Sequence, residues 1–116
     1  MAKTIDLVKE IANAALAKKA GRVVVQDLRN KSDVCDFQIV CSAGSDRQTQ
    51  AICNSIQEMT KKNLGERVIA VEGKQTGHWI LMDFSSVVVH IFLEEIRDYY
   101  AIEDLWPDAK IVNLDD

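Results

Sequence analysis

The sequence predicts a small α/β domain, in which a mixed five-stranded sheet packs with helices in the order αββαβββα. Two segments carry apolar residues at helical spacing, and five shorter runs are rich in β-branched residues. Turn-forming residues separate these runs, with no repeat or low-complexity segment between them. With 116 residues and 47% hydrophobic content, the chain is expected to bury one core as a single domain over residues 1–116.

Two long helices are predicted, over residues 4–20 and 45–65. In the first, Thr4 is the expected N-cap and Gly21 the expected stop. The apolar positions of this helix follow one stripe: Ile5, Val8, Ile11, Ala12, Ala15 and Leu16.

The second helix has the clearer boundaries. Ser45 followed by Gln48 is a capping-box signature, which gives both residues a structural role, and Gly65 is a natural C-terminal residue. Its inward stripe is formed by Ile52, Ile56 and Met59.

Five strands and a short terminal helix complete the prediction. The strands are expected over residues 22–29, 37–42, 67–73, 79–84 and 87–92. An acidic helical segment, 93–106, follows, and Pro107 ends it. Two long helices are too few to cover both faces of such a sheet, so part of one face is expected to stay open.

The last two strands are joined at Ser85-Ser86, and a two-residue loop fixes which side chains face each other. One face then pairs Phe84 with Val87, Met82 with Val89 and Ile80 with Ile91, and is wholly apolar. The other face pairs Trp79 with Phe92, Leu81 with His90 and Asp83 with Val88. The first set predicts the core face, and the second predicts a mixed surface.

Asp83 and His90 are diagonal neighbours in this register, close enough for a hydrogen bond. A hydrolytic triad would need a nucleophile, but the sequence has no Gly-x-Ser-x-Gly motif and no cysteine in a recognisable nucleophile context. We therefore assign His90 a structural role and expect no catalytic residues.

Metal and cofactor sites are not predicted either. The two histidines lack an H-x-x-x-H spacing, and the three cysteines form no C-x-x-C pair, so the thiols are expected to be buried and inert. The turn before Ser45 is followed by no Walker lysine, which favours a helix cap over a phosphate site. No Asp-x-Asp pair for two-metal nucleotidyl transfer is present on a strand.

Charge is unevenly distributed along the chain. Residues 94–116 hold eight of the 18 acidic residues and two of the 14 basic ones, a net charge of −6, whereas residues 1–93 carry +2. An acidic end disfavours direct nucleic-acid binding and suits a basic protein partner, although a solvated tail kept for solubility has the same composition. No leader and no membrane span are recognised, so the expected location is the cytoplasm.

The strings "SDRQTQAI", "HWILMDFSSVVVHIF", "IRDYY" and "IEDLWPDAK" resemble the ribosomal silencing factor family, also called Iojap-related, along nearly the whole chain. The resemblance implies a nucleotidyltransferase-like fold without the catalytic carboxylates. It also implies a non-enzymatic protein that binds the large ribosomal subunit through ribosomal protein fourteen, blocks association with the small subunit and represses translation under nutrient limitation. Members are often homodimers when free.

Carried over by position, the resemblance implies a protein-docking role for Trp79 and Tyr100, with the strand aspartate at Asp83 and the helix arginine at Arg97. The neighbouring Leu81, Phe92 and Glu94 complete the predicted docking set. Two departures from the family are Ser85-Ser86, where relatives carry a Gly-Asp turn, and Gln38, where they tend to be apolar.

Three alternatives stay open from the residues. In the first alternative, Trp79 only packs under the terminal helix against Tyr99 or Tyr100, which is compatible with a half-buried docking residue. In the second alternative, the chain is a nucleotide-dependent transferase that uses Gly44 and Ser45. In the third, it is a homodimeric scaffold whose open face serves only self-association.

Overall fold

The computed structural model describes residues 3–114 and shows one α/β unit built on a mixed sheet. Three α-helices and a short 3₁₀ helix, η1, accompany the sheet: α1 (Thr4–Leu16), α2 (Asp46–Leu64), α3 (Glu94–Tyr100) and η1 (Ile102–Leu105). The strands are β1 (Gly21–Asp27), β2 (Phe37–Ala43), β3 (Ala70–Glu72), β4 (Trp79–Asp83), β5 (Val87–Leu93) and β6 (Lys110–Ile111).

The sheet has the order β3-β4-β5-β2-β1-β6, so the predicted count of five strands is wrong by one. The additional strand, β6, is only two residues long and pairs antiparallel with the end of β1. β2 and β5 are parallel and the other neighbours antiparallel, which confirms the mixed sheet. Strand β3 is shorter than the predicted 67–73, with three paired residues.

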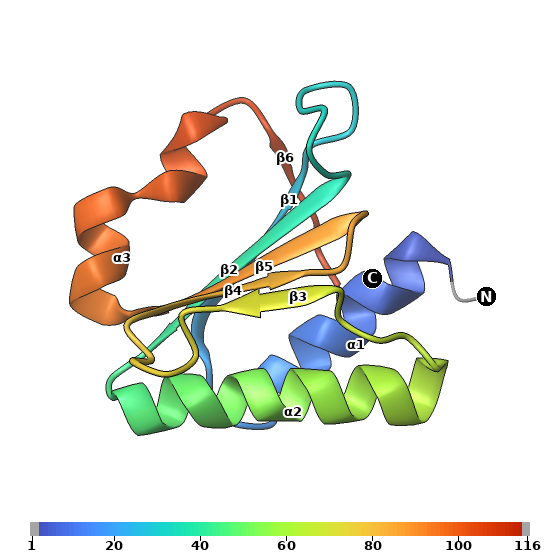
Figure 1. Ribbon diagram of the computed structural model, residues 1–116. Helices are drawn as coiled ribbons and strands as arrows, with labels where there is room; N and C mark the ends of the chain where they lie inside the picture. The colour runs from blue at the N-terminus through green and yellow to red at the C-terminus, as the bar shows by residue number, and fades with distance from the viewer. Residues whose placement is uncertain (1–2, 115–116) are drawn as a thin grey trace.

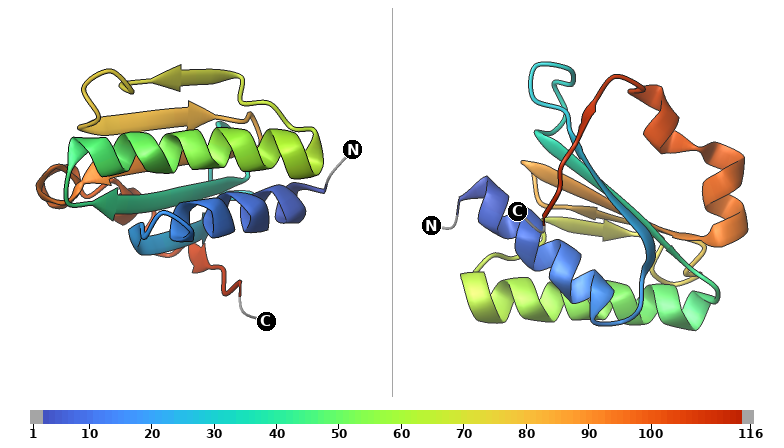
Figure 2. Two further views of the ribbon diagram at one scale, coloured as in Figure 1. Left: turned by 90° about the horizontal axis from the view of Figure 1, so that it is seen from below. Right: turned by 180° about the vertical axis from the view of Figure 1, so that it is seen from behind.

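Helices α1 and α2 lie side by side on one face of the sheet, and α3 with η1 lies on the other (Figures 1 and 2). We call these the inner and the outer face. The inner face meets both long helices in the main apolar core, to which Ile11, Ile39, Ile56, Ile80 and Ile91 contribute with no exposed surface.

Strand β2 is buried along its whole length because it lies under helices on both faces. This explains its weak sequence alternation, since a strand covered on both sides has no solvent side to mark with polar residues.

The ends of α2 match the predictions. Ser45 is the N-cap, and its Oγ accepts a hydrogen bond from the Gln48 backbone N–H at 3.2 Å. Gly65 takes the left-handed conformation, φ 66°, that the C-terminal position requires. The Gln48 side chain returns to the residue before the cap: its Oε1 accepts from the Gly44 backbone N–H at 3.4 Å. Its Nε2 donates to the carbonyl oxygens of Lys18 and Lys19, which ties α2 to the end of α1.

The limits of α1 differ from those predicted. Lys3, not Thr4, is the N-cap, and the helix ends at Leu16 rather than near Gly21, which begins β1 instead. Lys19 adopts a positive φ of 61° and turns the chain before the glycine is reached. Leu16 is consequently exposed, although its spacing fits the apolar stripe.

The predicted register of the β4–β5 hairpin is confirmed. Ile80 pairs with Ile91 and Met82 with Val89 on the inner face, and Trp79 pairs with Phe92, Leu81 with His90 and Asp83 with Val88 on the outer face. At the turn, Ser85 alone has a positive φ, 72°, and its backbone N–H donates to Asp83 Oδ1 at 2.7 Å. The Asp83 carboxylate thus stabilises a turn that lacks the expected glycine.

Candidate protein-docking surface

The outer face of the sheet is covered unequally. The α3–η1 segment and the chain that leads to β6 lie over β5, β2 and β1, whereas the outer sides of β4 and β3 are partly exposed. Of the predicted docking residues, Trp79 and Tyr100 meet where the covered and the open parts adjoin, Leu81 and Asp83 follow Trp79 along β4, and Glu94 begins α3. We call this region the β4–α3 surface and define it by Trp79, Leu81, Asp83, Glu94 and Tyr100.

Trp79 is the centre of an aromatic cluster on this surface. Its ring centroid lies 4.9 Å from those of both Phe92 and Tyr100, and its Nε1 donates a 3.0 Å hydrogen bond to His90 Nδ1. The backbone of Trp79 also lies directly against the turn at Gly73, where an added Cβ would be only 2.0 Å from the Trp79 carbonyl oxygen. Trp79 is therefore held on several sides and is still partly open to solvent.

The structure corrects the predicted partner of His90. Its Nδ1 accepts from Trp79, while Asp83 binds the Ser85 backbone instead. An accepting nitrogen is unprotonated, and burial of the ring lowers the pKa of His90 to about 4, against a smaller raising effect of Glu103. His90 is thus a buried neutral acceptor, which agrees with its predicted structural role.

Two further aromatic side chains are strongly exposed. Tyr100 is 52% exposed and packs against Trp79, as one of the two predicted tyrosine contacts requires. Tyr99 is 81% exposed and meets Tyr100 edge to face at a centroid distance of 5.0 Å. The sequence prediction omitted Tyr99 from the docking set, although its position beside Tyr100 was a signal for it.

Helix α3, which supplies Tyr100 to the aromatic cluster, also carries acidic side chains. Glu94, Glu95 and Asp98 all lie on α3 and are exposed, and Leu81 and Asp83 on β4 are half-buried. The surface therefore combines aromatic area with negative charge.

Two predicted docking residues do not reach the surface. Phe92 is fully buried beneath Trp79, and Arg97 is only 3% exposed. The prediction took Arg97 from the resemblance, as the helix arginine of the family, and assigned it polar and charge complementarity to a partner. In this fold both residues support the β4–α3 surface from below instead of offering atoms to a partner.

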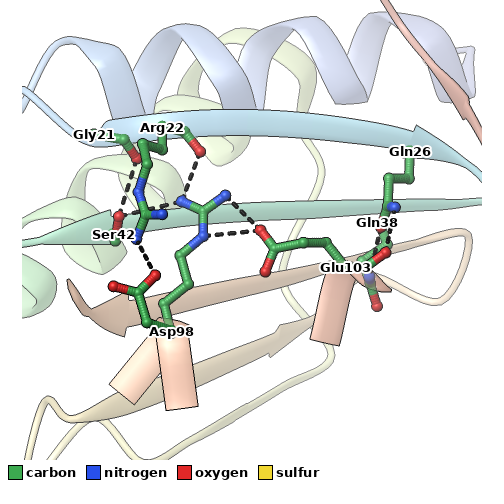
Figure 3. Close-up of polar contacts among 8 residues, drawn as sticks. Gly21, Arg22, Gln26, Gln38, Ser42, Asp98 and Glu103 are labelled. Atoms are coloured by element: carbon green, nitrogen blue, oxygen red, sulfur yellow. Dashed lines mark hydrogen bonds and ion pairs between the residues drawn. The ribbon is translucent and has the colours of Figure 1, made fainter. Parts of the chain in front are cut away.

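Arg97 is enclosed by a polar cluster that the sequence did not reveal, and Figure 3 labels its partners Arg22, Ser42 and Glu103. Its Nε and Nη2 donate to Glu103 Oε2 at 2.9 and 2.6 Å, and its Nη1 donates to the Arg22 carbonyl at 2.7 Å and to Ser42 Oγ at 3.2 Å. We call Arg97, Glu103, Ser42 and the Arg22 carbonyl the Arg97 cluster. It joins α3 and η1 to strands β1 and β2.

A second polar contact lies beside it. Gln38 Nε2 donates to Gln26 Oε1 at 2.9 Å, and Gln26 Nε2 donates to the Glu103 carbonyl at 2.8 Å (Figure 3). The polar residue at position 38 therefore has a buried partner on the neighbouring strand, which explains how it is accommodated under η1.

Within residues 3–114, no group of three or more His, Cys, Asp or Glu side chains is placed to hold a metal ion. The three cysteines are free and buried, and burial raises the pKa of Cys41 to about 12. In the same part of the chain, none of the helices has the length and apolar character needed to cross a membrane.

Comparisons with known proteins point in one direction. A family model described as "Ribosomal silencing factor during starvation" matches residues 1–116. A ribosomal silencing factor of Bacillus subtilis (strain 168) is 37% identical over 110 residues, covering 95% of this chain and 92% of that protein. The chloroplastic protein Iojap of Arabidopsis thaliana is 29% identical over 113 residues, 97% of this chain and 47% of that protein. A crystal structure of a Chromobacterium violaceum protein superimposes with a TM-score of 0.88 at 32% identity, covering 94% of this chain and 90% of the other.

Proposed function

This chain belongs to the ribosomal silencing factor family, and from that premise we propose that it acts by steric exclusion on the large ribosomal subunit. It binds the subunit through ribosomal protein fourteen, prevents the small subunit from joining and so represses translation when nutrients are limiting. Binding alone suffices for this activity, so the proposal assigns no reaction, metal or cofactor to the chain. Its place of action is the cytoplasm, where the ribosomes are.

The β4–α3 surface is the observation that carries this proposal. A partly exposed tryptophan, supported by Phe92 and flanked by Tyr100, has the character of an interface hot spot, because a preorganised aromatic ring buries a large area with little loss of side-chain entropy. The exposed acids Glu94 and Glu95 add negative charge on α3, whereas Asp98 is paired with Arg22. Ribosomal proteins are basic, so Glu94 and Glu95 supply electrostatic complementarity and faster association.

Self-association of the free protein belongs to the same proposal. Tyr99 and Leu105 expose large apolar area near the docking surface, which a second copy of the chain would cover in a homodimer. If the two copies use the same tryptophan, ribosome binding and dimer formation are mutually exclusive. Sedimentation of the free protein and of Trp79→Ala over a range of concentrations tests whether Trp79 lies in the interface between the two copies.

Co-sedimentation with purified large subunits is the direct test. We expect the wild type to travel with the subunit, and Trp79→Ala combined with Tyr100→Ala to stay at the top of the gradient. A loss of at least about 2 kcal/mol in binding is typical of a truncated hot spot. Leu16→Ala is the matched control, since it removes an exposed apolar side chain from α1, on the other side of the sheet, and should bind normally. A double variant that co-sediments like the wild type contradicts the proposal.

The transferase alternative makes a different prediction. It requires saturable binding of a nucleoside triphosphate with magnesium at the turn formed by Gly44 and Ser45. Ser45 Oγ is engaged as the cap of α2, which gives this turn a structural use. A calorimetric titration that shows no heat of binding removes this alternative, and a saturable isotherm that is lost in Ser45→Ala supports it.

A further inference from the structure

The α3–η1 segment contains almost no fully buried side chains. Helix α3 has seven residues and no side-chain N-cap, and an isolated helix of this length is not stable in water. Arg97 is its one buried residue, and η1 has none. A small apolar cluster of Leu28, Cys35 and Ala109, with Val88 and Trp106, holds the chain that follows η1. The enclosed contact of α3 and η1 themselves is the polar one made by Arg97.

The Arg97 cluster provides contacts that are specific in direction as well as strong. The guanidinium group donates twice to one carboxylate oxygen of Glu103 and also binds one backbone and one side-chain oxygen on β1 and β2. A planar group with donors on all sides is fixed in orientation by such a set, which a lysine ammonium group would not be. The described chain leaves no buried side-chain nitrogen or oxygen without a partner, so the cluster is fully satisfied.

Tyr100 lies three residues after Arg97, on the next turn of the same helix. The orientation of Arg97 therefore determines where the Tyr100 ring meets Trp79, 4.9 Å away between centroids. We infer that Arg97 is a positioning residue: through Glu103, Ser42 and the Arg22 carbonyl it holds α3 in the pose that forms the β4–α3 surface. This inference rests on the proposed function for its biological meaning but concerns the geometry of the free protein.

A positioning role and a purely structural role of Arg97 predict different results when the guanidinium group is removed. The main core, formed by α1, α2 and the inner face, contains no member of the Arg97 cluster. Removing the guanidinium group is therefore expected to release the α3–η1 segment while α1 and α2 remain folded. A residue needed only for stability would instead loosen the whole domain.

Arg97→Met is the principal variant, because it keeps an unbranched side chain and removes every donor. In a Trp106→Phe background, which leaves Trp79 as the sole tryptophan, we expect the emission to shift to the red and acrylamide quenching to increase about twofold or more as Tyr100 moves away. Amide exchange should accelerate over residues 94–106 and stay slow in α2. Affinity for purified large subunits should fall about tenfold or more, the effect expected for losing hydrogen bonds to a charged group.

Arg22→Met is the matched control. It makes the same chemical change and removes an ion pair to Asp98 on the same helix, but that pair is exposed and the Arg22 carbonyl still accepts from Arg97. We expect quenching, exchange and affinity to remain within about twofold of the wild type, as for most surface ion pairs.

Glu103→Gln is the second variant, for the case that Arg97→Met does not fold. Its amide oxygen can take the place of Oε2 and accept both bonds from Arg97, but it carries no negative charge, so an effect between those of Arg97→Met and the control supports the inference. The inference is overturned if Arg97→Met keeps wild-type quenching and affinity, or if its amides in α2 and in residues 94–106 exchange faster to the same degree. A wild-type protein that does not bind large subunits would refute the proposed function, whereas quenching and exchange would still decide the role of Arg97.

Discussion

The two faces of the sheet are held to their helices by different physical interactions. On the inner face, α1 and α2 meet side chains such as Ile39 and Ile80, which are fully buried and apolar. On the outer face, α3 and η1 are fixed by the Arg97 cluster and by the contact of Trp79 with Tyr100. Only a small apolar cluster, Leu28, Cys35 and Ala109 with Val88 and Trp106, lies beside them.

The difference shows how this small domain separates stability from recognition. Apolar burial is strong but nondirectional, so it stabilises the fold without defining one orientation of a surface ring. Hydrogen bonds to charged groups bury less surface but fix the orientation of the groups that they join, which suits a surface whose shape must match a partner. Substitutions of apolar residues on the inner face should therefore change mainly stability, and those of exposed residues on the outer face should change mainly binding.

The largest effect is expected from neighbouring residues of β4 that point to opposite faces. Ile80→Ala creates a cavity in the main core and should lower the free energy of unfolding by about 2–5 kcal/mol. Leu81→Ala, on the half-buried outer side, should cost less than about 1.5 kcal/mol, since only part of the side chain is removed from water. Urea denaturation measures both. Equal losses for the two variants would show that the faces contribute alike to stability.

Lowering the pH tests how much the neutral form of His90, on the outer face, contributes to the stability of the fold. Burial depresses its pKa to about 4 in the folded protein, against 6.5 for an ordinary histidine, so the unfolded chain takes up the proton first. The stability associated with neutral His90 is complete above pH 6.5 and is lost as the pH falls toward 4, by roughly 3 kcal/mol in all.

Urea denaturation between pH 7 and pH 4 measures this loss. His90→Gln, whose amide oxygen can accept from Trp79, should flatten the profile, whereas His78→Gln, at an exposed position, should leave it unchanged. An unchanged slope in His90→Gln would assign the acid sensitivity to other groups.

The inner face could be predicted from the sequence, and much of the outer face could not. The β4–β5 register followed from alternation and a short turn, because a shift of one residue would move every apolar side chain to the wrong face. Strand β6 was missed because two residues, Lys110 and Ile111, carry no periodic signal.

The outer-face errors have a common physical origin. Trp79 and Asp83 are both diagonal neighbours of His90, and the sequence alone did not distinguish them. The longer indole reaches across the diagonal, whereas the short carboxylate is used by the turn. The burial of Arg97 depends on Glu103, Ser42 and Arg22, which come from three separate segments that meet only in the folded chain.

A single polar contact in the inner-face helices should contribute less to the free energy of unfolding than a core side chain does. Ser45→Ala removes the N-cap of α2 and should reduce the free energy of unfolding by about 1 kcal/mol, since the Gln48 backbone N–H loses its acceptor. Gly44→Ala is the control at the adjacent residue, where an added Cβ meets nothing within 4 Å. Thermal unfolding measures both, and an unchanged Tm for Ser45→Ala would show that water replaces the cap without loss.

The smallest effect is expected for the ion pair between Arg22 and Asp98, whose side chains are 51% and 67% exposed. Replacing either partner should change the free energy of unfolding by less than about 1 kcal/mol, because solvent screens the charges and the ordered side chains lose entropy. A double-mutant cycle of Arg22→Met and Asp98→Asn in urea, repeated in high salt, measures the coupling directly. The same cycle on Arg97 and Glu103 should give the larger coupling, because that pair is enclosed and shares two hydrogen bonds. Equal couplings in the two cycles would mean that burial adds nothing to the outer-face contacts, and that Arg97 holds α3 no more firmly than a surface ion pair does.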